Sequence, residues 1–177
     1  VRPIIEADPD LSHALLPLLD ARAVLFTTYR ELDRRVKRAA SQDETCLRFM
    51  AIPGVGPIAA LTFKAAVDDP GRFTSSRTVA AHFGLTPRRY QSGEMDNPGR
   101  ISKVGDADVR SALYAAANAM MMRSVANSEI KSWGLRLMRR KGRRRAIVAV
   151  ARKLAVIMHR MWADNTEIRQ RPLEDAA

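Results

Sequence analysis

Several features that define large protein classes are missing from this sequence. It has one cysteine, Cys46, in 177 residues, which excludes an internal disulfide and favours a reducing compartment such as the cytoplasm. No apolar stretch approaches the roughly 18 residues that a membrane-spanning helix requires, and the N-terminus lacks the basic-then-apolar pattern of a signal peptide. We therefore expect no membrane partner.

Metal and nucleotide motifs are missing as well. The three histidines, His13, His82 and His159, are far apart and have no partner at Cys-x-x-Cys or His-x-x-x-His spacing, so we expect no metal site in this chain. No glycine-rich loop with a following Lys-Ser succeeds a strand pattern, which argues against a nucleotide triphosphatase. The residues therefore predict no cofactor for this chain.

Basic residues, in contrast, are abundant. Thirty Lys and Arg against nineteen Asp and Glu give a formal charge of +11 and a pI near 10.8, which favours a polyanionic partner without distinguishing DNA from RNA. Seven of the ten residues from 136 to 145 are basic. With two more on a later helix, the predicted nucleic-acid contacts here are Arg136, Arg139, Arg140, Lys141, Arg143, Arg144, Arg145, Arg152 and Lys153. The alternative is an ordinary solvated helix face.

The first segment is predicted to be a long helix with a narrow apolar stripe. The stripe combines two series with a seven-residue period, which make one a/d seam of about four heptads. Its members are Leu11, Leu18, Leu25, Leu32 and Ala39 in one series, and Leu15, Arg22, Tyr29 and Val36 in the other. The seam predicts self-pairing in a homodimer or homotetramer, or else docking against the rest of the chain; the charged residues that flank it favour self-pairing.

A short helix is predicted next. Ser41 and Glu44 have the spacing of a capping box, and the helix that follows carries Cys46, which is expected to be buried beside apolar neighbours. Beyond a Pro-Gly-Val-Gly turn, a second helix can begin at Pro57. Its predicted apolar face is made of Ile58, Leu61 and Ala65.

This helix, Gly-x-Gly turn, helix pattern is typical of a helix-hairpin-helix unit. Gly54 and Gly56 would let the backbone turn tightly, and the free amides at the start of the second helix would point at a phosphate oxygen. Such binding would not depend on base sequence. A plain tight turn between packed helices is the alternative, because Pro-Gly is itself a strong turn signal.

The remaining periodic segments predict a helical core. A helix capped by Ser75 or Ser76 is expected to reach His82, an alanine-rich helix is expected after Asp106 or Asp108, and two more are expected over 129–141 and from 144 to about 163. The inward residues are predicted to be Val109, Leu113, Ala116, Ala117 and Met120 on the alanine-rich helix, and Ile147, Val150, Ala151, Leu154, Met158 and Met161 on the last one. Arg152 and Lys153 should point outward.

The stretch from residue 84 to 106 has no apolar period and is predicted to be a loop or short hairpin that presents polar groups. Ser92 stands there beside a glycine, with basic residues close by in sequence: Arg88, Arg89, Arg100, Lys103 and Arg110. A serine hydroxyl among guanidinium groups suits attack on a phosphodiester, because the cations would neutralise charge on the equatorial phosphate oxygens. The alternative is a basic hairpin that only grips a phosphate backbone, with Ser92 as a turn residue.

Arg110 poses a separate question. It falls in the first turn of the alanine-rich helix, where the helix dipole disfavours a cation by a few tenths of a kcal/mol. We therefore expect an anionic partner for it, either Asp106 or a DNA phosphate. On that ground Arg110 joins the predicted nucleic-acid contacts.

Five separated motifs occur in an order that resembles the C-terminal half of insertion-sequence transposases of the IS110/IS116 family. They are Ile52-Pro53-Gly54-Val55-Gly56-Pro57, Phe83-Gly84-Leu85-Thr86-Pro87, Ser92-Gly93, Ile101-Ser102-Lys103-Val104-Gly105-Asp106 with Arg110, and Ala151-Arg152-Lys153-Leu154-Ala155. The resemblance runs from about residue 45 to 165. It implies a bacterial recombinase related to site-specific DNA invertases, in which the serine of the Ser-Gly motif becomes joined to DNA; Ser92 matches that serine.

The resemblance also implies parts that this sequence does not contain. Family members carry an N-terminal ribonuclease-H-like domain whose acidic residues bind Mg²⁺, and they use a structured guide RNA, the bridge RNA, to pair with DNA. The chain is therefore expected to be a fragment or truncated product that is inactive alone. The runner-up function is a non-catalytic helix-hairpin-helix module that binds nucleic acid and assembles.

The predicted organisation follows from these patterns. The fold class is mainly α, with a coiled-coil helix over 1–44, a compact transposase domain over 45–165 that contains the helix-hairpin-helix unit and the catalytic hairpin, and a disordered tail over 166–177. The expected partners are DNA, the guide RNA and further copies of the chain.

Overall fold

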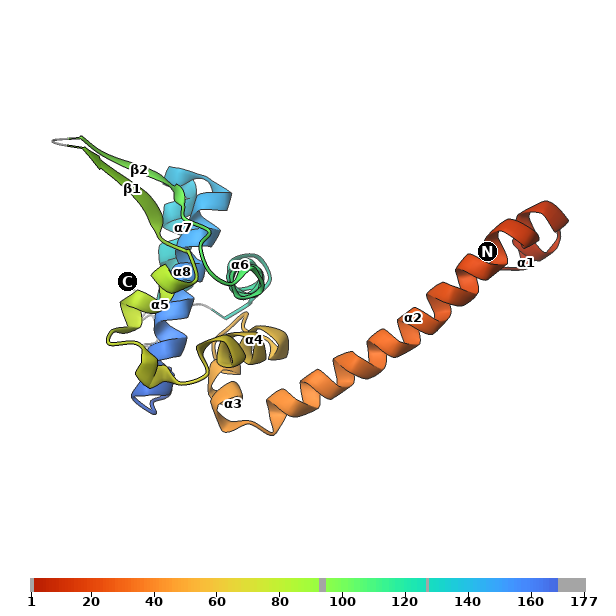
Figure 1. The fold of residues 1–177 in the computed structure, drawn as a ribbon, viewed down its shortest axis with the longest axis horizontal. Helices are drawn as coiled ribbons and strands as arrows, with labels where there is room; N and C mark the ends of the chain where they lie inside the picture. The colour runs from red at the N-terminus through yellow and green to blue at the C-terminus, as the bar shows by residue number, and fades with distance from the viewer. Residues whose placement is uncertain (1, 93–94, 127, 169–177) are drawn as a thin grey trace, which may run out of the picture. The chain divides into compact units, whose positions relative to one another are not determined.

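Helices make up most of the residues that the structure describes, and a two-stranded ribbon interrupts them (Figure 1). The computed structural model describes residues 2–92, 95–126 and 128–168, and only the backbone within 89–99. The helices are α1 (Arg2–Glu6), α2 (Pro9–Ser41), α3 (Glu44–Met50), α4 (Pro57–Val67), the 3-10 helix η1 (Pro70–Arg72), α5 (Ser76–His82), α6 (Ala107–Met122), α7 (Glu129–Lys141) and α8 (Arg143–Ala163). The strands are β1 (Pro87–Ser92) and β2 (Met95–Ile101). The prediction of a mainly α fold is confirmed.

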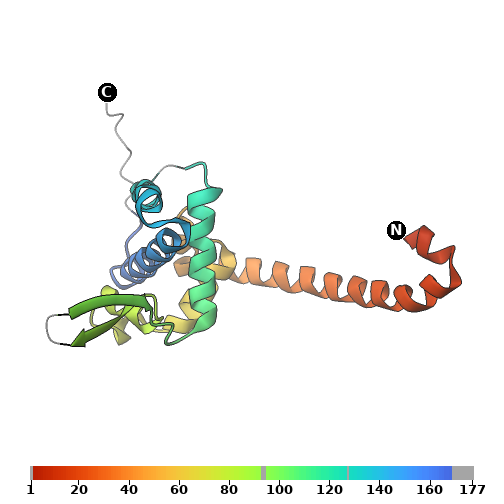
Figure 2. The same cartoon turned by 90° about the horizontal axis from the view of Figure 1, so that it is seen from above.

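The chain divides into two compact units, Val1–Ala39 and Ala40–Ala177. In the first, α1 folds back on the beginning of α2 (Figure 2). Ser12 Oγ donates a hydrogen bond to the Ile5 carbonyl at 2.7 Å, and Arg2 pairs with Asp20 at 2.6 Å. These contacts bury Ile5 and join α1 to the long helix.

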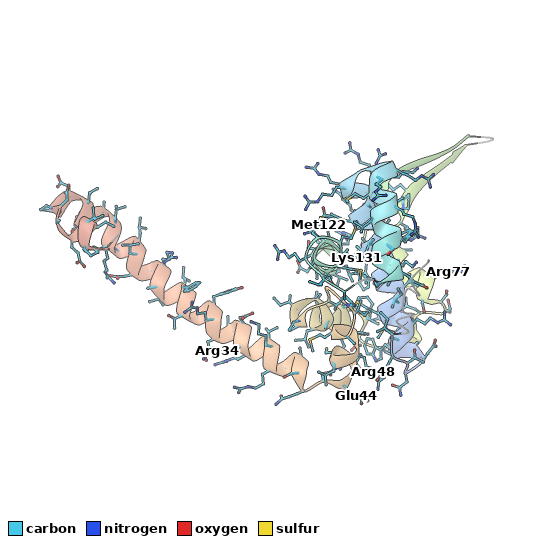
Figure 3. All side chains as sticks on the ribbon, turned by 180° about the vertical axis from the view of Figure 1, so that it is seen from behind. Arg34, Glu44, Arg48, Arg77, Met122 and Lys131 are labelled. Atoms are coloured by element: carbon cyan, nitrogen blue, oxygen red, sulfur yellow. The ribbon has the colours of Figure 1, made fainter. Side chains whose placement is uncertain are left out.

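The second unit begins at Ala40, which is fully buried in its core. Asp43 then caps α3, because its carboxylate accepts a hydrogen bond from the Cys46 amide at 2.8 Å. The prediction that Ser41 opens this helix is wrong, since Ser41 is the last residue of α2. The short helix also carries an ion pair between Glu44 and Arg48, which lie one turn apart (Figure 3).

Asp43 also forms an ion pair with Lys64 of α4. The hydrogen bond from Lys64 and, after it, the one from the Cys46 amide hold the pKa of Asp43 below its usual 3.8 against the cost of desolvation. Burial, reinforced by the neighbouring Asp43 carboxylate, raises the pKa of the Cys46 thiol to about 11. Cys46 is thus a neutral, buried thiol, as predicted.

Helix α4 begins at Pro57, as predicted, but it turns a different face to the core. Ala59, Ala60, Phe63 and Val67 are buried, whereas Ile58 is 57% exposed. Of the predicted apolar face of Ile58, Leu61 and Ala65, Leu61 is partly buried against the core, whereas Ile58 and Ala65 are exposed, so this face is not the buried one. The cause is that Phe63 must reach the aromatic cluster, where it packs edge-on against Phe49 with ring centroids 5.6 Å apart.

The core is organised around α8. Helices α5, α6 and α7 pack on it, and α4 packs on α6. The predicted inward residues of α6 and α8 are all buried, which confirms the 3.6-residue period of both helices. Trp162 near the end of α8 closes the aromatic cluster edge-on against Phe49, with centroids 6.0 Å apart.

Several helices begin at the capping residues that the sequence predicted. Ser75 caps α5, and Asp106 caps α6 by accepting hydrogen bonds from Asp108 and Val109. Helix α7 covers Glu129–Lys141 as expected. After α8, the Thr166 amide donates to Met161, and Ile168 packs against the core. The rest of the predicted tail, residues 169–177, lies outside the described residues.

Candidate nucleic-acid interface

The segment predicted as a loop or hairpin forms an antiparallel ribbon. Strand β1 pairs with β2, with Arg89 opposite Pro98 and Ser92 opposite Met95. The ribbon extends away from the helices (Figures 1 and 2). Ser92 is the last residue of β1, at the end of the ribbon that is remote from the helices. The side chain of Ser92, like that of Arg89, lies outside the described residues, as does Gly93.

The ribbon contains a β-bulge near its base. One residue of β1, Arg88, lies opposite two residues of β2, Gly99 and Arg100. Arg88 Nη2 donates a hydrogen bond to the Ser102 carbonyl at 3.1 Å. A bulge bends and twists a ribbon locally, and the Arg88 bond holds the two strands together at this bend.

The predicted catalytic set is therefore spread along the ribbon rather than gathered around Ser92. At about 3.3 Å per residue, the Cα atom of Arg88 lies ~13 Å from that of Ser92. Arg100 is opposite Arg88, and Lys103 follows β2; both side chains are exposed. Arg88, Arg100 and Lys103 thus form a basic surface at the base of the ribbon, which we call the ribbon base.

Arg110 was expected to have an anionic partner, but backbone carbonyl groups surround it instead. Its Nη1 atom donates to backbone carbonyls, including that of Gly105 at 2.8 Å and that of Asp106 at 3.0 Å. The Asp106 carboxylate instead accepts from the amides of Asp108 and Val109. The expectation of an Asp106 ion pair is wrong because that carboxylate already caps α6.

The Gly-x-Gly turn joins α3 to α4, and its two glycines differ. Gly54 has a positive φ of 89° and abuts the backbone of α6, so that a Cβ there would lie 2.6 Å from the Ala116 oxygen. Gly56 has an ordinary φ of −100° and open space around its Cβ position. Gly54 thus serves helix packing, and Gly56 is the accessible member of the pair.

Helix α4 starts at Gly56 without a side-chain cap. The amides of its first turn are the groups that a helix-hairpin-helix unit offers to a phosphate. The start of α4 contains no acidic residue that would repel an anion. The geometry at Gly56 is compatible with phosphate contact, whereas Gly54 faces α6.

The junction of α7 and α8 gathers the basic run. Gly142 ends α7 and begins α8 with a φ of 81°, and α8 also lacks a side-chain cap there. The basic side chains on both sides of this junction are exposed: Arg136, Arg139, Arg140, Lys141, Arg143, Arg144 and Arg145. We call this set the basic junction. Arg143 also bonds Asn118 of α6 at 3.1 Å, which places the basic junction beside α6.

Arg152 and Lys153 lie further along α8, and both are exposed as predicted. Lys153 Nζ lies over the ring of Trp133 on α7, 4.9 Å from its centroid. This cation–π contact orients the ammonium while leaving it accessible. Lys153 also borders a hollow of about 450 Å³ between the start of α7 and the end of α8.

The seam of the first unit is exposed on α2. Leu18 is 66% exposed and Leu25 is 70% exposed, and Tyr29 and Leu32 follow them on the same side. Arg22, which interrupts the seam, lies with Arg30 against the ring of Phe26, at 5.8 and 4.3 Å from its centroid. An apolar stripe of this length is unusual on a soluble surface.

Neither a metal cluster nor a membrane helix is found in the described parts of the chain. No group of three or more His, Cys, Asp or Glu side chains is close enough there to hold a metal ion. Among those residues, no helix is long and apolar enough to cross a membrane. His159 is instead a buried structural residue, whose ring nitrogens lie 3.0 Å from Ser76 Oγ and from the Pro70 carbonyl.

A helical unit that carries a projecting ribbon and basic surfaces fits a DNA-processing domain, and comparison with known proteins identifies the kind. The sequence model of the Transposase IS116/IS110/IS902 family matches residues 46–132, which include the Gly-x-Gly turn, the ribbon and α6. The matched region is a transposase domain. The chain belongs to the IS116/IS110/IS902 family of transposases.

Individual relatives extend the similarity beyond the matched region. The chain is 37% identical over 134 residues, 75% of its length, to the transposase for insertion sequence element IS1111A of Coxiella burnetii. It is 32% identical over 94% of its length to the putative transposase y4pF/y4sB of Sinorhizobium fredii, and 30% identical over 86% to the probable family 20 transposase of Pseudomonas aeruginosa. These alignments cover 36%, 44% and 45% of the relatives, so the chain spans less than half of their length.

Sequence reasoning missed two features of this surface. It did not separate Gly54 from Gly56, because a Gly-x-Gly motif does not tell which glycine has a positive φ. It also missed the carbonyl cluster around Arg110, since backbone acceptors leave no mark on residue identity. The neighbouring glycines, Gly84 and Gly105, were the available signal of a close backbone crossing.

Proposed function

We propose that this chain is the recombinase region of a DNA transposase, and that Ser92 is the nucleophile that becomes joined to DNA. The observation that carries the proposal is the position of Ser92 at the outer end of a ribbon whose base is basic and which is anchored to a rigid helical unit. A nucleophile on such a ribbon can reach a phosphodiester that is bound against the surface behind it.

The proposed reaction is a transesterification. Ser92 Oγ attacks the phosphorus of a phosphodiester, the O–P bond forms, and the bond from phosphorus to the 3′ oxygen breaks. A base takes the proton of the serine hydroxyl, and the 3′ oxygen takes up a proton from an acid as it leaves, which gives a 3′ hydroxyl. The resulting 5′-phosphoserine link keeps the bond energy, so that a 3′ hydroxyl of another strand can attack it and restore the DNA.

The basic residues divide into two roles under this proposal. Arg88, Arg89, Arg100 and Lys103 on the ribbon would stabilise the charge that develops on the phosphate during attack. The basic junction, Arg152, Lys153 and the uncapped start of α4 at Gly56 would hold the phosphate backbone without reading bases. The separation of about 13 Å between Arg88 and Ser92 along the strand means that the DNA would have to follow the ribbon.

Under this proposal, other parts of the system choose the target and bind the metal ion. We propose that a bridge RNA guides the whole protein to its DNA, as the family resemblance implies, because the surfaces described here offer no evident base-reading set. Mg²⁺ would be bound by a ribonuclease-H-like domain. The described residues lack a carboxylate cluster that fits Mg²⁺, so no step above is assigned to the metal.

A second function is supported by a specific observation. The predicted arginines are not gathered at Ser92, and the strongest basic surface is at the α7–α8 junction. A non-catalytic module that binds nucleic acid and assembles through α2 would have these features. In that case Ser92 would be an ordinary residue near a turn.

Denaturing electrophoresis separates the two functions. A transposase of full family length that contains this chain is incubated with nicked cognate DNA and its guide RNA, and the products are denatured and resolved. A nucleophilic Ser92 gives a species in which protein and DNA migrate together. A binding module gives free DNA only, even where native gels show full complex formation.

A further inference from the structure

Arg110 gathers four backbone carbonyl oxygens around one nitrogen atom. Its Nη1 atom lies 3.3 Å from the Phe83 oxygen, 3.1 Å from that of Val104, 2.8 Å from that of Gly105 and 3.0 Å from that of Asp106. Because this nitrogen carries only two protons, the four contacts share them. Charge-assisted bonds of this kind are stronger than bonds between neutral groups.

These carbonyls come from three different parts of the fold. Phe83 is the C-terminal cap of α5, where the helix dipole is negative and favours a cation. Val104 and Gly105 belong to the segment that leaves β2. Asp106 is the cap of α6, the helix that carries Arg110 itself. One side chain therefore joins the end of α5, the exit of the ribbon and the start of α6.

The backbone at this point is packed too closely for ordinary residues. A Cβ on Gly84 would lie 2.3 Å from the Val104 oxygen, and a Cβ on Gly105 would lie 2.1 Å from the His82 oxygen. Gly84, Gly105 and Lys103 all have positive φ, at 65°, 80° and 56°. The segments that enter and leave the ribbon thus cross at contact distance, and Arg110 binds this crossing.

Two hydrogen bonds continue the crossing into the ribbon. The Ser102 amide donates to Thr86 at 2.9 Å, and the Lys103 amide donates to Gly84 at 3.1 Å. Beyond them the strands contact mainly each other. The described contacts that fix the direction of the ribbon relative to the helices therefore lie at the crossing.

Because Ser92 lies far from the crossing, a small rotation of the ribbon at the crossing moves Ser92 by a large distance. At about 3.3 Å per residue, Ser92 lies ~17 Å beyond Pro87, so a rotation of about 10° at the base would move it by roughly 3 Å. A displacement of about 1 Å in a reacting group can cost on the order of 100-fold in rate. The stiffness of the crossing therefore controls whether Ser92 reaches its phosphorus.

We infer that Arg110 is a positioning residue for the transposition reaction, which fixes the angle of the ribbon through the carbonyl cluster instead of binding a phosphate. The inference rests on the proposed role of Ser92. It replaces the expectation that Arg110 contacts DNA, because Arg110 is a partly buried residue whose Nη1 protons are shared among four carbonyls of the protein itself. Removal of Arg110 would loosen the ribbon while leaving the DNA-binding surface in place.

Hydrogen exchange tests the structural half of this inference on the chain itself. The amides of Ser102 and Lys103 report on the crossing, and core amides of α6 and α8 serve as the internal reference. Arg110→Gln is expected to raise exchange at Ser102 and Lys103 at least 10-fold with the core unchanged, and Arg110→Lys is expected to restore part of the protection. The matched control is Arg77→Gln, which removes one exposed cation from α5 (Figure 3). Unchanged exchange in Arg110→Gln would overturn the inference.

Kinetics test the functional half in a transposase of full family length. Arg110→Gln should slow strand cleavage by about 100-fold, with DNA affinity and its salt dependence unchanged. A loss of affinity with a smaller salt slope would assign Arg110 to phosphate contact and reject the positioning role. If Arg110→Gln also reduces the protection of core amides, Gly105→Ala is used in its place, because it opens the same crossing without removing a charge. Gly105→Ala should raise exchange at Ser102 and Lys103 and slow strand cleavage. Normal cleavage and normal exchange in Gly105→Ala would count against the inference.

The two proposals fail in different ways. If Ser92→Ala keeps full cleavage activity, Ser92 is not the nucleophile, yet faster exchange at Ser102 and Lys103 in Arg110→Gln would still establish the anchoring of the ribbon. If exchange is unchanged while Ser92→Ala abolishes cleavage, the nucleophile stands and the positioning role of Arg110 falls.

Discussion

Gly54 lies against the backbone of Met120, so closely that a Cβ atom on Gly54 would be 2.6 Å from the Met120 amide nitrogen. The turn between α3 and α4 is therefore pressed onto α6, and the first glycine of the Gly-x-Gly motif is required for packing. The second, Gly56, has no atom within 4 Å of its Cβ position. A motif that suggests one function thus contains two residues with different roles.

This difference predicts opposite effects of two alanine substitutions. Gly54→Ala should lower the free energy of unfolding by at least ~2 kcal/mol, because it combines a positive φ with a backbone clash. Gly56→Ala should change that free energy by less than about 0.5 kcal/mol and act on nucleic-acid affinity instead. Urea denaturation and a binding titration of both variants provide the check. Equal stability losses would contradict the assignment of packing to Gly54 alone.

The ion pair between Asp43 and Lys64 predicts a pH-dependent contribution to stability. Asp43→Asn keeps an acceptor for the cap of α3 but removes the charge that pairs with Lys64, so it should cost about 0.5–1 kcal/mol at pH 7. Because the pKa of Asp43 is lowered in the folded state, this difference should be fully present above its unfolded value of about 3.8 and disappear as the pH falls through the lower folded value. Urea denaturation at pH 7, 5, 3 and 2 measures it, because the loss starts near pH 3.8 and is complete only below the lowered folded value. A difference that persists at the lowest pH would show that the charge is not its cause.

The basic junction predicts a salt-dependent, sequence-independent interaction. Replacement of Arg143, Arg144 and Arg145 by Gln should reduce the slope of log affinity against log salt by about 0.9 for each of the three that contacts a duplex phosphate. Two duplexes of unrelated sequence should lose affinity alike. The control replaces Arg30, Arg34 and Arg35 of α2 by Gln, which removes the same charge from the other unit. A slope that falls equally in the control would mean that net charge, and not the basic junction, governs binding.

The exposed seam on α2 predicts assembly of the chain. We expect a homodimer or homotetramer in light scattering, and a smaller species when Leu18 and Leu25 are both replaced by Ser, because these residues supply apolar area to the interface. A chain that starts at Ser41 should behave like this variant. Arg34→Ser, on the charged surface of the same helix, is the control. An unchanged mass in the Leu18/Leu25 variant would leave docking of the seam within one chain as the explanation.

Much of the helical fold followed from local signals in the sequence. Apolar period predicted the buried faces of α6 and α8, and short polar side chains predicted their caps, as with Asp106, because both signals act within one or two turns. The inward face of α4 was not predictable in this way. It is set by the contact of Phe63 with Phe49, which lie in different helices.

The candidate site was predictable only in part for the same reason. The ribbon could be expected from its lack of apolar period, and the position of Ser92 at its outer end is a consequence of strand register. The bulge at Arg88 and the carbonyl cluster around Arg110 depend on how two backbone segments cross. Glycines such as Gly84 and Gly105 indicate that two backbone segments approach closely, but the sequence does not show which segments they contact.

The yield of covalent protein–DNA product shows whether Ser92 is the nucleophile. Nicked cognate DNA is incubated with a transposase of full family length, either as wild type or carrying Ser92→Ala or Ser102→Ala. Ser102 lies at the base of the same ribbon, so Ser102→Ala is the matched control. The products are counted after denaturing electrophoresis, and DNA affinity is measured in parallel. We expect the joined species in wild type and Ser102→Ala and none in Ser92→Ala, with equal affinity in all three. A joined species at wild-type yield in Ser92→Ala would show that another group attacks the DNA.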